Sequence, residues 1–363
     1  MSIDYKEILK KLCLTPGPSG FEEESARLIQ NYFSNYCDEV EIDFAGNVIG
    51  TINGKDSGLP PVMVNAHMDR VGFIVSMINN DGLIKLRAIG GPNEKTLPGL
   101  VLKVRKKDHS GWVPIACGVK CVHKITENEK SSELTINDIF FDTGAADAQE
   151  VRALGIEIGC PVVFNPSFEE LSAGTVCATA LDNCGSVAAL IGIAEALHNE
   201  RPIRTTFLVA NVWEEYNQRG TKALVRRFHP VAVISMDMLL AADTPDLEGS
   251  MQSALGGGPA ASCFNYSFDS NIGCIAHEGL YTIAEKAASS CGCNLQRYVC
   301  GGCGDNAHAM YEEDYPAVIE IGAPVRYAHS PAEVANINDM IDTSRTVSKM
   351  IQMIDTDFNQ HRY

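Results

Sequence analysis

The stretch Val62-Met-Val-Asn-Ala-His-Met-Asp69 decides the fold that the sequence predicts. Its first four residues form a short run that is typical of a buried strand, and a histidine and an aspartate follow where the run ends. Three further runs, at residues 206–210, 231–234 and 317–321, have the same character and also precede polar residues. Open α/β sheets bind their ligands beyond the carboxyl ends of such strands. The sequence therefore predicts an α/β fold with a functional site at this edge of the sheet.

The polar residues that follow these runs, or that lie near a predicted helix start, are the candidate functional residues. Two histidines and three carboxylates have the ligand types that hold a pair of divalent ions about 3.5–4 Å apart. A further glutamate beside one of them could take a proton from a water whose pKa the metals lower towards 7. The set consists of His67, Asp182, Glu214, Glu215, Asp237 and His329. This pattern indicates a two-metal hydrolase.

The spacing of His67 and Asp69 predicts a supporting contact. Side chains two residues apart on a strand point to the same side, so we expect Asp69 to accept a hydrogen bond from the far nitrogen of the His67 ring. Each candidate also has a structural interpretation when it is taken alone. Asp182 could cap a helix, and Glu214 with Glu215 could belong to a solvated loop. His67 could be a structural histidine, Asp237 a loop acid, and His329 part of a turn. Five compatible ligands at the ends of strands or helices favour a metal site instead.

Composition excludes several classes of function. The chain has 363 residues, of which 45% are hydrophobic, so it is long enough for two domains with a sizeable core. Its 29 Lys and Arg against 46 Asp and Glu give a formal net charge of −17, which would repel nucleic acid and anionic membranes. No run approaches the roughly 20 apolar residues of a membrane span, and the amino terminus lacks a signal-peptide pattern. We expect a cytoplasmic protein that binds neither nucleic acid nor membranes.

The cysteines permit more than one interpretation. Thirteen is an odd number, so the cysteines cannot all pair within the chain, and reduced thiols are the simplest interpretation. Cys291, Cys293, Cys300 and Cys303 could hold a structural zinc, although their spacing is irregular for a zinc ribbon. Cys300 and Cys303 alone could be redox-active, but no thioredoxin-like unit is apparent around them.

The beginning of the chain has helical and then β character. Residues 3–12 and a segment that ends near Tyr36 have helical patterns. Ser19 and Glu22 are expected to form a capping box for the second of these helices. Residues 40–52 predict a hairpin, because two β runs flank a short turn.

The middle of the chain has a different sequence pattern from both ends. Residues 71–167 contain short β runs and turns, with one helical pattern near 146–154, and predict a β-rich domain inserted into the first one. Strong helical patterns at 186–198 and 338–358 mark the return of α/β alternation. The expected boundaries give a mixed-sheet catalytic domain at residues 1–70 and 168–363 and an inserted, small β-barrel-like domain at residues 71–167.

Motifs from one end of the chain to the other carry a resemblance to a known family. They are Thr15-Pro-Gly-Pro-Ser-Gly-Phe-Glu22, Gly46-Asn47, Ala66-His-Met-Asp69 with Val71-Gly-Phe73, Ala180-Leu-Asp182, Glu214-Glu215 with Arg219-Gly220, Asp237, Asp243-Thr-Pro245, Gly256-Gly-Gly-Pro259 and Arg326-Tyr-Ala-His-Ser-Pro331. In this order they resemble the tetrahedral aminopeptidases, which are dinuclear-metal relatives of glutamyl aminopeptidase and of endoglucanase-M-like proteins. The set is highly specific.

The resemblance implies roles for the candidate residues. One ion would be held by His67, Asp182 and Asp237, and the other by Asp182 as the bridging ligand with Glu215 and His329. Glu214 would be the general base, and Asp69 would stand behind His67. The ions would be zinc, or else cobalt or manganese, since mixed His/carboxylate sites accept several metals. The resemblance also implies a cis peptide bond between Asp182 and Asn183.

The family resemblance further implies a phosphorylase/hydrolase-like catalytic domain and a dodecameric shell, to which we expect the inserted domain at 71–167 to contribute most contacts. It places Cys300 to Asp305 on a loop near the site. The chain departs from the family at Arg70, where a glutamate is usual, and at Asn183, Trp213 and residues 216–218. Arg70 either biases the site towards negatively charged substrates or points outward to pair with a surface acid.

The function expected from this resemblance is an aminopeptidase that removes the amino-terminal residue of short peptides. Two alternatives remain at this point. One is a catalytically drifted, metal-binding regulatory protein, because the surroundings of the ligands differ from the family pattern. The other is a glycoside hydrolase, which would need two carboxylates at a sugar and would leave His67 and His329 without a role.

Overall fold

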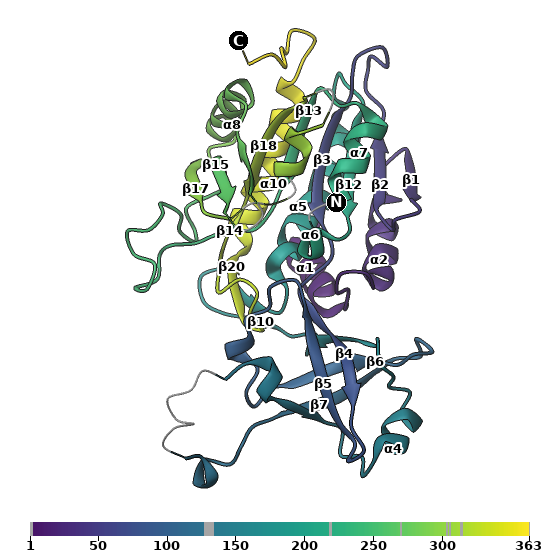
Figure 1. Ribbon diagram of the computed structural model, residues 1–363. Coiled ribbons are helices and arrows are strands. Elements are labelled where there is room, and N and C mark those ends of the chain that lie inside the picture. Colours follow the sequence, from purple (N-terminus) through teal and green to yellow (C-terminus); the bar gives the residue numbers. More distant parts are fainter. Residues whose placement is uncertain are drawn as a thin grey trace.

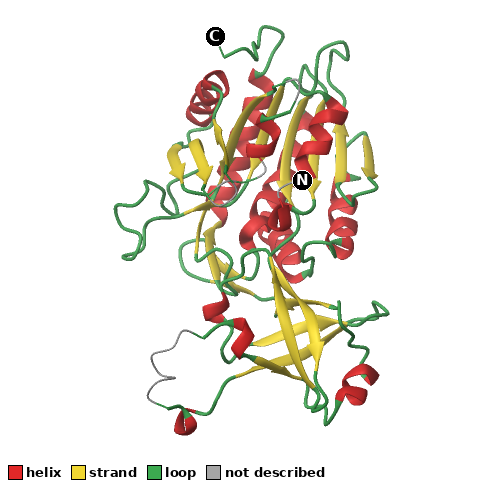
Figure 2. Ribbon diagram, in the orientation of Figure 1, coloured by secondary structure: helices red, strands yellow, loops and turns green. Residues whose placement is uncertain are grey.

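The structure of the chain is a computed structural model that describes residues 3–126, 134–217, 220–268, 271–302, 304, 306–312 and 315–362. A large part, in which a twisted sheet lies among helices, stands above a smaller part built mainly of strands (Figure 1). Figure 2 shows that most helices surround the large sheet. The predicted fold class, a mixed-sheet α/β protein with an additional small barrel, is confirmed.

A sheet of nine strands forms the centre of the large part, in the order β1-β2-β12-β3-β13-β18-β15-β16, with β17 also paired to β15. Its four middle strands are parallel, so their carboxyl ends meet at one edge. The predicted strands and the predicted hairpin β1-β2 are confirmed. The bounds are β1 (Glu39–Ile42), β2 (Val48–Ile52), β3 (Val62–His67), β12 (Thr206–Asn211), β13 (Ala232–Met236), β15 (Ala260–Ser267), β16 (Ile272–Ile275), β17 (Gln296–Cys300) and β18 (Ala317–Gly322).

Helices cover both faces of this sheet, which is why all six residues of β3 are buried. Val62 and Val64 pack into the larger core with five helices, whereas Met63 faces a smaller core with two others, because strand side chains alternate. The first group is α1 (Tyr5–Leu14), α2 (Glu23–Phe33), α5 (Leu181–Asn199), α8 (Glu278–Ser290) and α10 (Ile337–Met353). The second group is α7 (Gly220–Phe228) and α9 (Asn306–Met310).

The start of α2 differs from the prediction. Glu22 is the N-cap residue, but no side chain caps the helix, so the expected capping box with Ser19 is wrong. The Ser19 hydroxyl instead donates a 2.5 Å hydrogen bond to Asp69 Oδ2, and Glu22 Oε1 accepts one of 2.7 Å from Gly20 N. Ser19 thus holds the loop before α2 next to the end of β3, and Glu22 bonds within that loop.

A second sheet of five strands, in the order β10-β11-β20-β19-β14, lies beside the carboxyl edge of the large one. Strand β11 leads into α5, and the loop between β19 and β20 contains His329. This sheet therefore places two of the candidate ligands. The bounds are β10 (Phe168–Glu170), β11 (Thr175–Ala178), β14 (Leu239–Leu240), β19 (Pro324–Arg326) and β20 (Glu333–Asn336).

The smaller part is a closed barrel with the strand order β4-β5-β8-β7-β6-β9. It has a core of its own, centred on side chains such as Phe73, Leu102 and Phe141. All its strands lie between residues 72 and 164, while the precise boundaries at 70/71 and 167/168 remain predictions. The bounds are β4 (Gly72–Ile78), β5 (Leu83–Ile89), β6 (Val101–Arg105), β7 (Trp112–Gly118), β8 (Phe140–Asp142), β9 (Pro161–Phe164) and helix α4 (Ala148–Ala153), with short 3-10 turns at Glu94–Thr96, Val122–Lys124 and Ile136–Asp138.

Within the described ranges, no helix combines the length and the hydrophobicity that a membrane span requires.

Candidate active site

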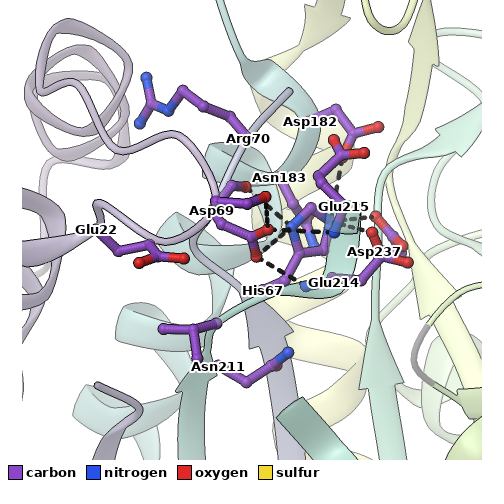
Figure 3. Close-up of polar contacts among 12 residues, drawn as sticks. Glu22, His67, Asp69, Arg70, Asp182, Asn183, Asn211, Glu214, Glu215 and Asp237 are labelled. Carbon is purple, nitrogen blue, oxygen red and sulfur yellow. Dashed lines mark hydrogen bonds and ion pairs between the residues drawn. The ribbon is translucent and has the colours of Figure 1, made fainter. Parts of the chain in front are cut away.

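The six candidate residues converge at the carboxyl edge of the large sheet. They line one cavity of about 950 Å³. His67 is the last residue of β3, Asp237 directly follows β13, and Glu214 with Glu215 begins α6 (Glu214–Asn217) after β12. Asp182 lies in the first turn of α5, and His329 follows β19. Figure 3 shows the carboxylates of Asp182, Glu214 and Asp237 near the His67 ring, to which they come from different segments of the chain.

Two groups of ligand atoms share Asp182. His67 Nε2 lies 3.3 Å from Asp182 Oδ1 and 3.4 Å from Asp237 Oδ1. The other carboxylate oxygen, Asp182 Oδ2, lies 3.7 Å from His329 Nε2, which is 3.4 Å from Glu215 Oε1. In each group of three residues, the ligand atoms all lie within 4.8 Å of one another. These are the two trios that the family resemblance implies, and Asp182 belongs to both.

The electrostatics of the site fit bound cations. Burial raises the pKa of the Glu215 carboxyl well above its usual value, and the charge of Asp182 raises it further. Burial also raises the pKa of Asp237, against the opposing effect of His67. Burial disfavours a charged His67, yet Asp237 and Asp182 together raise its pKa well above the usual value. Buried carboxylates this close together are costly unless cations neutralise them.

Unpartnered oxygens support the same conclusion. Among the described residues, nothing forms a hydrogen bond to the buried Asp182 Oδ1 or Glu215 Oε1. Their contacts of 3.3 Å with His67 Nε2 and 3.4 Å with His329 Nε2 are ion-pair contacts rather than hydrogen bonds. Nitrogen from histidine and oxygen from carboxylates are the ligands of zinc and similar divalent ions. The residues present therefore fit two divalent ions.

The contact predicted between His67 and Asp69 differs in detail. His67 Nδ1 lies 3.0 Å from the main-chain carbonyl oxygen of Asp69 and 3.6 Å from its carboxylate Oδ1, so the carbonyl holds the ring. The carboxylate instead accepts hydrogen bonds of 3.1 Å from the main-chain N–H groups of Glu214 and Glu215. Asp69 thus fixes the segment that carries both glutamates, because its two carboxylate oxygens bind consecutive main-chain N–H groups.

The backbone around the candidate ligands is unusual. The peptide bond between Asp182 and Asn183 is cis, which confirms the prediction. Ala180, Trp213 and His329 have positive φ angles of 59°, 64° and 63°, a conformation that non-glycine residues adopt mainly where their surroundings enforce it. Each of these residues is a candidate ligand or lies within two residues of one. Strained backbone of this kind is common at functional sites.

The departure at Asn183 has a structural reason. Its side-chain Nδ2 donates a 3.0 Å hydrogen bond to the carbonyl oxygen of Met236, at the end of β13. An aspartate could not donate this bond unless it were protonated. Asn183 thus connects the segment that carries Asp182 with the segment that carries Asp237.

Both interpretations of Arg70 are wrong. The side chain is only 4% exposed, and Figure 3 shows it directed away from the site. Its guanidinium donates 3.3 Å hydrogen bonds to the carbonyl oxygens of Leu12 and Cys13 at the end of α1, and contacts Cys184 Sγ at 3.4 Å. A cation is favourable beside the carbonyl end of a helix. Arg70 therefore anchors α1 rather than binding substrate or a surface acid.

Sequence reasoning missed Glu333, the first residue of β20. Its Oε2 accepts a 2.9 Å hydrogen bond from Asp182 N, and its Oε1 accepts one of 2.7 Å from His329 N. The residue is 2% exposed, and burial raises its pKa well above the usual value. One carboxylate thus joins the main chains of two candidate ligands that are far apart in sequence. A single glutamate after a turn carries no sequence signal for this role.

The barrel also reaches the site. His329 Nδ1 lies 2.9 Å from the carbonyl oxygen of Gly91, in the segment that follows β5. A carbonyl in this position accepts a hydrogen bond from the Nδ1–H group, which leaves Nε2 free to bind a metal. The sequence did not predict this contact either, because no local pattern relates Gly91 to His329.

The cysteine cluster is only partly described. Cys303 and Asp305 lie outside the described residues, and so do Arg219 of the family motifs and Gln218, one of the departures from the family. No cysteine in the described part of the chain belongs to a compact group of potential metal ligands. Cys291 Sγ lies near Arg345 O, whereas Cys300 lines the active-site cavity.

Comparison with known proteins places this geometry in a family. The family model described as M42 glutamyl aminopeptidase matches residues 46–345. SgcX of Escherichia coli strain K12 is 30% identical over 97% of this chain and 95% of its own. A TET aminopeptidase from a marine sediment thaumarchaeote is 25% identical, has a TM-score of 0.90 and is matched over 97% of this chain and 98% of its own.

The fold is shared with more distant proteins as well. TET1 peptidase of Pyrococcus horikoshii is 24% identical, with a TM-score of 0.84 over 95% of this chain and 98% of its own. That protein is described as able to assemble into a tetrahedron or a large octahedral shell. Since the family model covers most of the sequence and the two trios of ligands meet at the expected edge of the sheet, this chain belongs to the M42 glutamyl aminopeptidase family.

Proposed function

We propose that the protein is a two-metal aminopeptidase that hydrolyses the amino-terminal residue from short peptides. The observation that carries this proposal is the pair of ligand groups that share Asp182 in one cavity. His67, Asp182 and Asp237 would hold one ion, and Asp182, Glu215 and His329 the other. When bound, divalent ions such as zinc, cobalt or manganese polarise the scissile carbonyl group and make a water molecule more acidic.

Glu214 is the residue that we assign as general base. It lies outside both ligand groups, lines the cavity and is 9% exposed. Its Oε2 is 3.9 Å from His67 Nε2, so it stands at the edge of the ligands without belonging to them. Its carboxylate would take a proton from the attacking water and return it to the leaving amine. Asp69 would support this step by holding the main chain of Glu214.

We also propose a closed homo-oligomer in which residues 71–167 make most of the contacts. Support comes from the description of the Pyrococcus horikoshii relative, whose fold this chain shares. The two groups of metal ligands do not require a second subunit, because all their residues come from a single chain.

Two other functions make different predictions. A drifted regulatory protein would bind the metals without hydrolysing any peptide. A glycoside hydrolase would need no metal, and the two histidines among the carboxylates argue against it. Metal content measured together with hydrolysis of a panel of aminoacyl substrates separates these functions.

The sharpest test compares the same change at adjacent positions. Glu214→Gln should lower kcat by about 10²- to 10⁴-fold and leave the metal content near two ions per chain, because it removes the base but no ligand. Glu215→Gln should lower the affinity for metal as well. Metal content is measured by atomic emission and activity with aminoacyl 4-nitroanilides. Loss of metal in Glu214→Gln would mean that the base and the ligand have been assigned the wrong way round.

A further inference from the structure

The active-site cavity contains an acidic residue that the proposed mechanism does not use. The acidic residues that line it are Asp182, Glu214, Glu215, Asp237 and Glu320. The first four are accounted for as metal ligands and general base. Glu320, in β18, belongs to neither ligand group, and it is 4% exposed. No lysine or arginine is found among the described residues that line the cavity.

Sheet geometry places Glu320 below the metal ligands. Glu320 is opposite Ser235 of the neighbouring strand β13, and Asp237 lies two residues further along that strand. Residues two apart on a strand face the same side, so Glu320 projects from the same face as Asp237, roughly 6–7 Å deeper along the strand axis. The strands stay close up to their ends, since a Cβ atom on Gly322 would stand 1.6 Å from the carbonyl oxygen of Asp237.

The Glu320 carboxylate is held in a defined orientation. Asn265 Nδ2 donates a 2.8 Å hydrogen bond to Glu320 Oε2. The other end of the same amide, Asn265 Oδ1, accepts a 2.8 Å bond from Cys274 N, which determines which way the amide points. Asn265 is 1% exposed and also lines the cavity. Glu320 is therefore a preorganised acceptor at the floor of the cavity.

We propose that Glu320 forms the subsite for the side chain of the substrate's amino-terminal residue and selects lysine or arginine there. This inference rests on the proposed aminopeptidase function, which brings that residue next to the metal ligands. A lysine side chain carries an ammonium on a flexible four-carbon stem, and the guanidinium of arginine also suits a carboxylate. Both could pass the ligands and place their charge at the depth of the buried Glu320 carboxylate, and no lysine or arginine lies among the described lining residues.

The test compares lysine with norleucine, which has a similar stem but no ammonium. For the metal-loaded wild type, we expect kcat/KM to be about 10- to 100-fold higher for lysyl than for norleucyl 4-nitroanilide, since a hydrogen bond to a charged partner contributes on this scale. Glu320→Gln keeps the size of the side chain and should reduce the ratio to near 1, mainly by lowering the lysyl value. The control Glu285→Gln removes one negative charge from the surface, where Glu285 pairs with Arg297, and should leave the ratio unchanged.

A second measurement separates this inference from the proposed function. Calorimetry gives the dissociation constants of free L-lysine and L-norleucine for the metal-loaded protein, and we expect tighter binding of lysine by a similar factor. If no substrate is hydrolysed but lysine binds more tightly than norleucine, the proposed function is overturned and the subsite stands. If norleucyl substrates are hydrolysed as well as lysyl ones by wild type, the subsite is overturned and the function stands. An equal loss of both activities in Glu320→Gln would assign Glu320 to the shared α-amino group and would also overturn the subsite.

Discussion

Glu333 offers the most direct test of how the two metal ligands from distant segments are brought together. In Glu333→Gln, one of the two carboxylate oxygens becomes an NH2 group. The two oxygens now accept hydrogen bonds from the main-chain N–H groups of Asp182 and His329, at 2.9 and 2.7 Å. A glutamine can accept only one of these bonds, and its NH2 group must face the other donor. The variant thus disturbs two residues of the same ligand group without removing a ligand.

The expected loss of metal affinity in Glu333→Gln follows from these contacts. A hydrogen bond to a charged partner contributes about 1.5–3 kcal/mol, and a buried N–H group without a partner costs a similar amount. Removal of a buried negative charge beside Asp182 offsets part of this loss, because burial and Asp182 raise the pKa of Glu333. Changes in residues that support metal ligands typically lower metal affinity 10- to 100-fold. We expect such a loss, equivalent to about 1.4–2.7 kcal/mol, at the group formed by Asp182, Glu215 and His329.

The assay is calorimetric titration of the metal-free protein with zinc, together with thermal unfolding. One of the two binding events should weaken in Glu333→Gln, and the other should change much less. Glu312→Gln serves as the matched control, because Glu312 is equally buried but pairs with Lys222 and Arg226 away from the ligands. It should lower thermal stability and leave both affinities unchanged. The reasoning is refuted if Glu333→Gln lowers stability as the control does but binds both ions as tightly as wild type.

Three further predictions follow from other parts of the structure. Arg70→Met should lower the free energy of unfolding by about 2–4 kcal/mol, because carbonyl groups at the end of α1 lose their donors. The ranking of acidic, neutral and basic substrates should stay as in wild type, and a changed ranking without loss of stability would contradict this account. Light scattering should return a large closed oligomer, whereas a monomer at working concentration would exclude it. A hydrogen bond from Arg201 lowers the pKa of Asp38, so its stabilisation is present at neutral pH and is lost as the pH falls through that lowered pKa. Asp38→Asn should therefore be less stable by about 1 kcal/mol at pH 7, and its stability should converge with that of wild type once the pH falls below the lowered pKa of Asp38. A difference that does not shrink on acidification would refute the assignment.

The confirmed predictions concern local patterns. Apolar runs predicted the four parallel strands, since a strand buried on both faces must be apolar over its whole length. The position of His67 at the end of such a run was visible for the same reason. The cis bond after Asp182 followed from family resemblance rather than from any physical property of the sequence.

The wrong predictions concern side-chain partners. Ser19 was expected to cap a helix three residues away, but it bonds to Asp69, fifty residues further along the chain. Arg70 was expected at the site or at the surface, and it contacts the end of α1. A charged or hydroxyl side chain can form similar bonds with many partners, so its own sequence neighbourhood does not specify which one it meets.

The sequence by itself determined which segments are strands and helices, that the chain has an α/β fold, and which residue types are available to bind metal. These properties depend on the periodicity of apolar residues and on the chemistry of each side chain, both of which are local. Only the tertiary structure decided that Glu333 joins Asp182, 151 residues away from it, to His329, that Gly91 of the barrel segment holds His329, and that Glu320 lies below the ligands. Such contacts exist only after the sheets have paired and the helices have packed, because packing brings together groups that no local pattern relates.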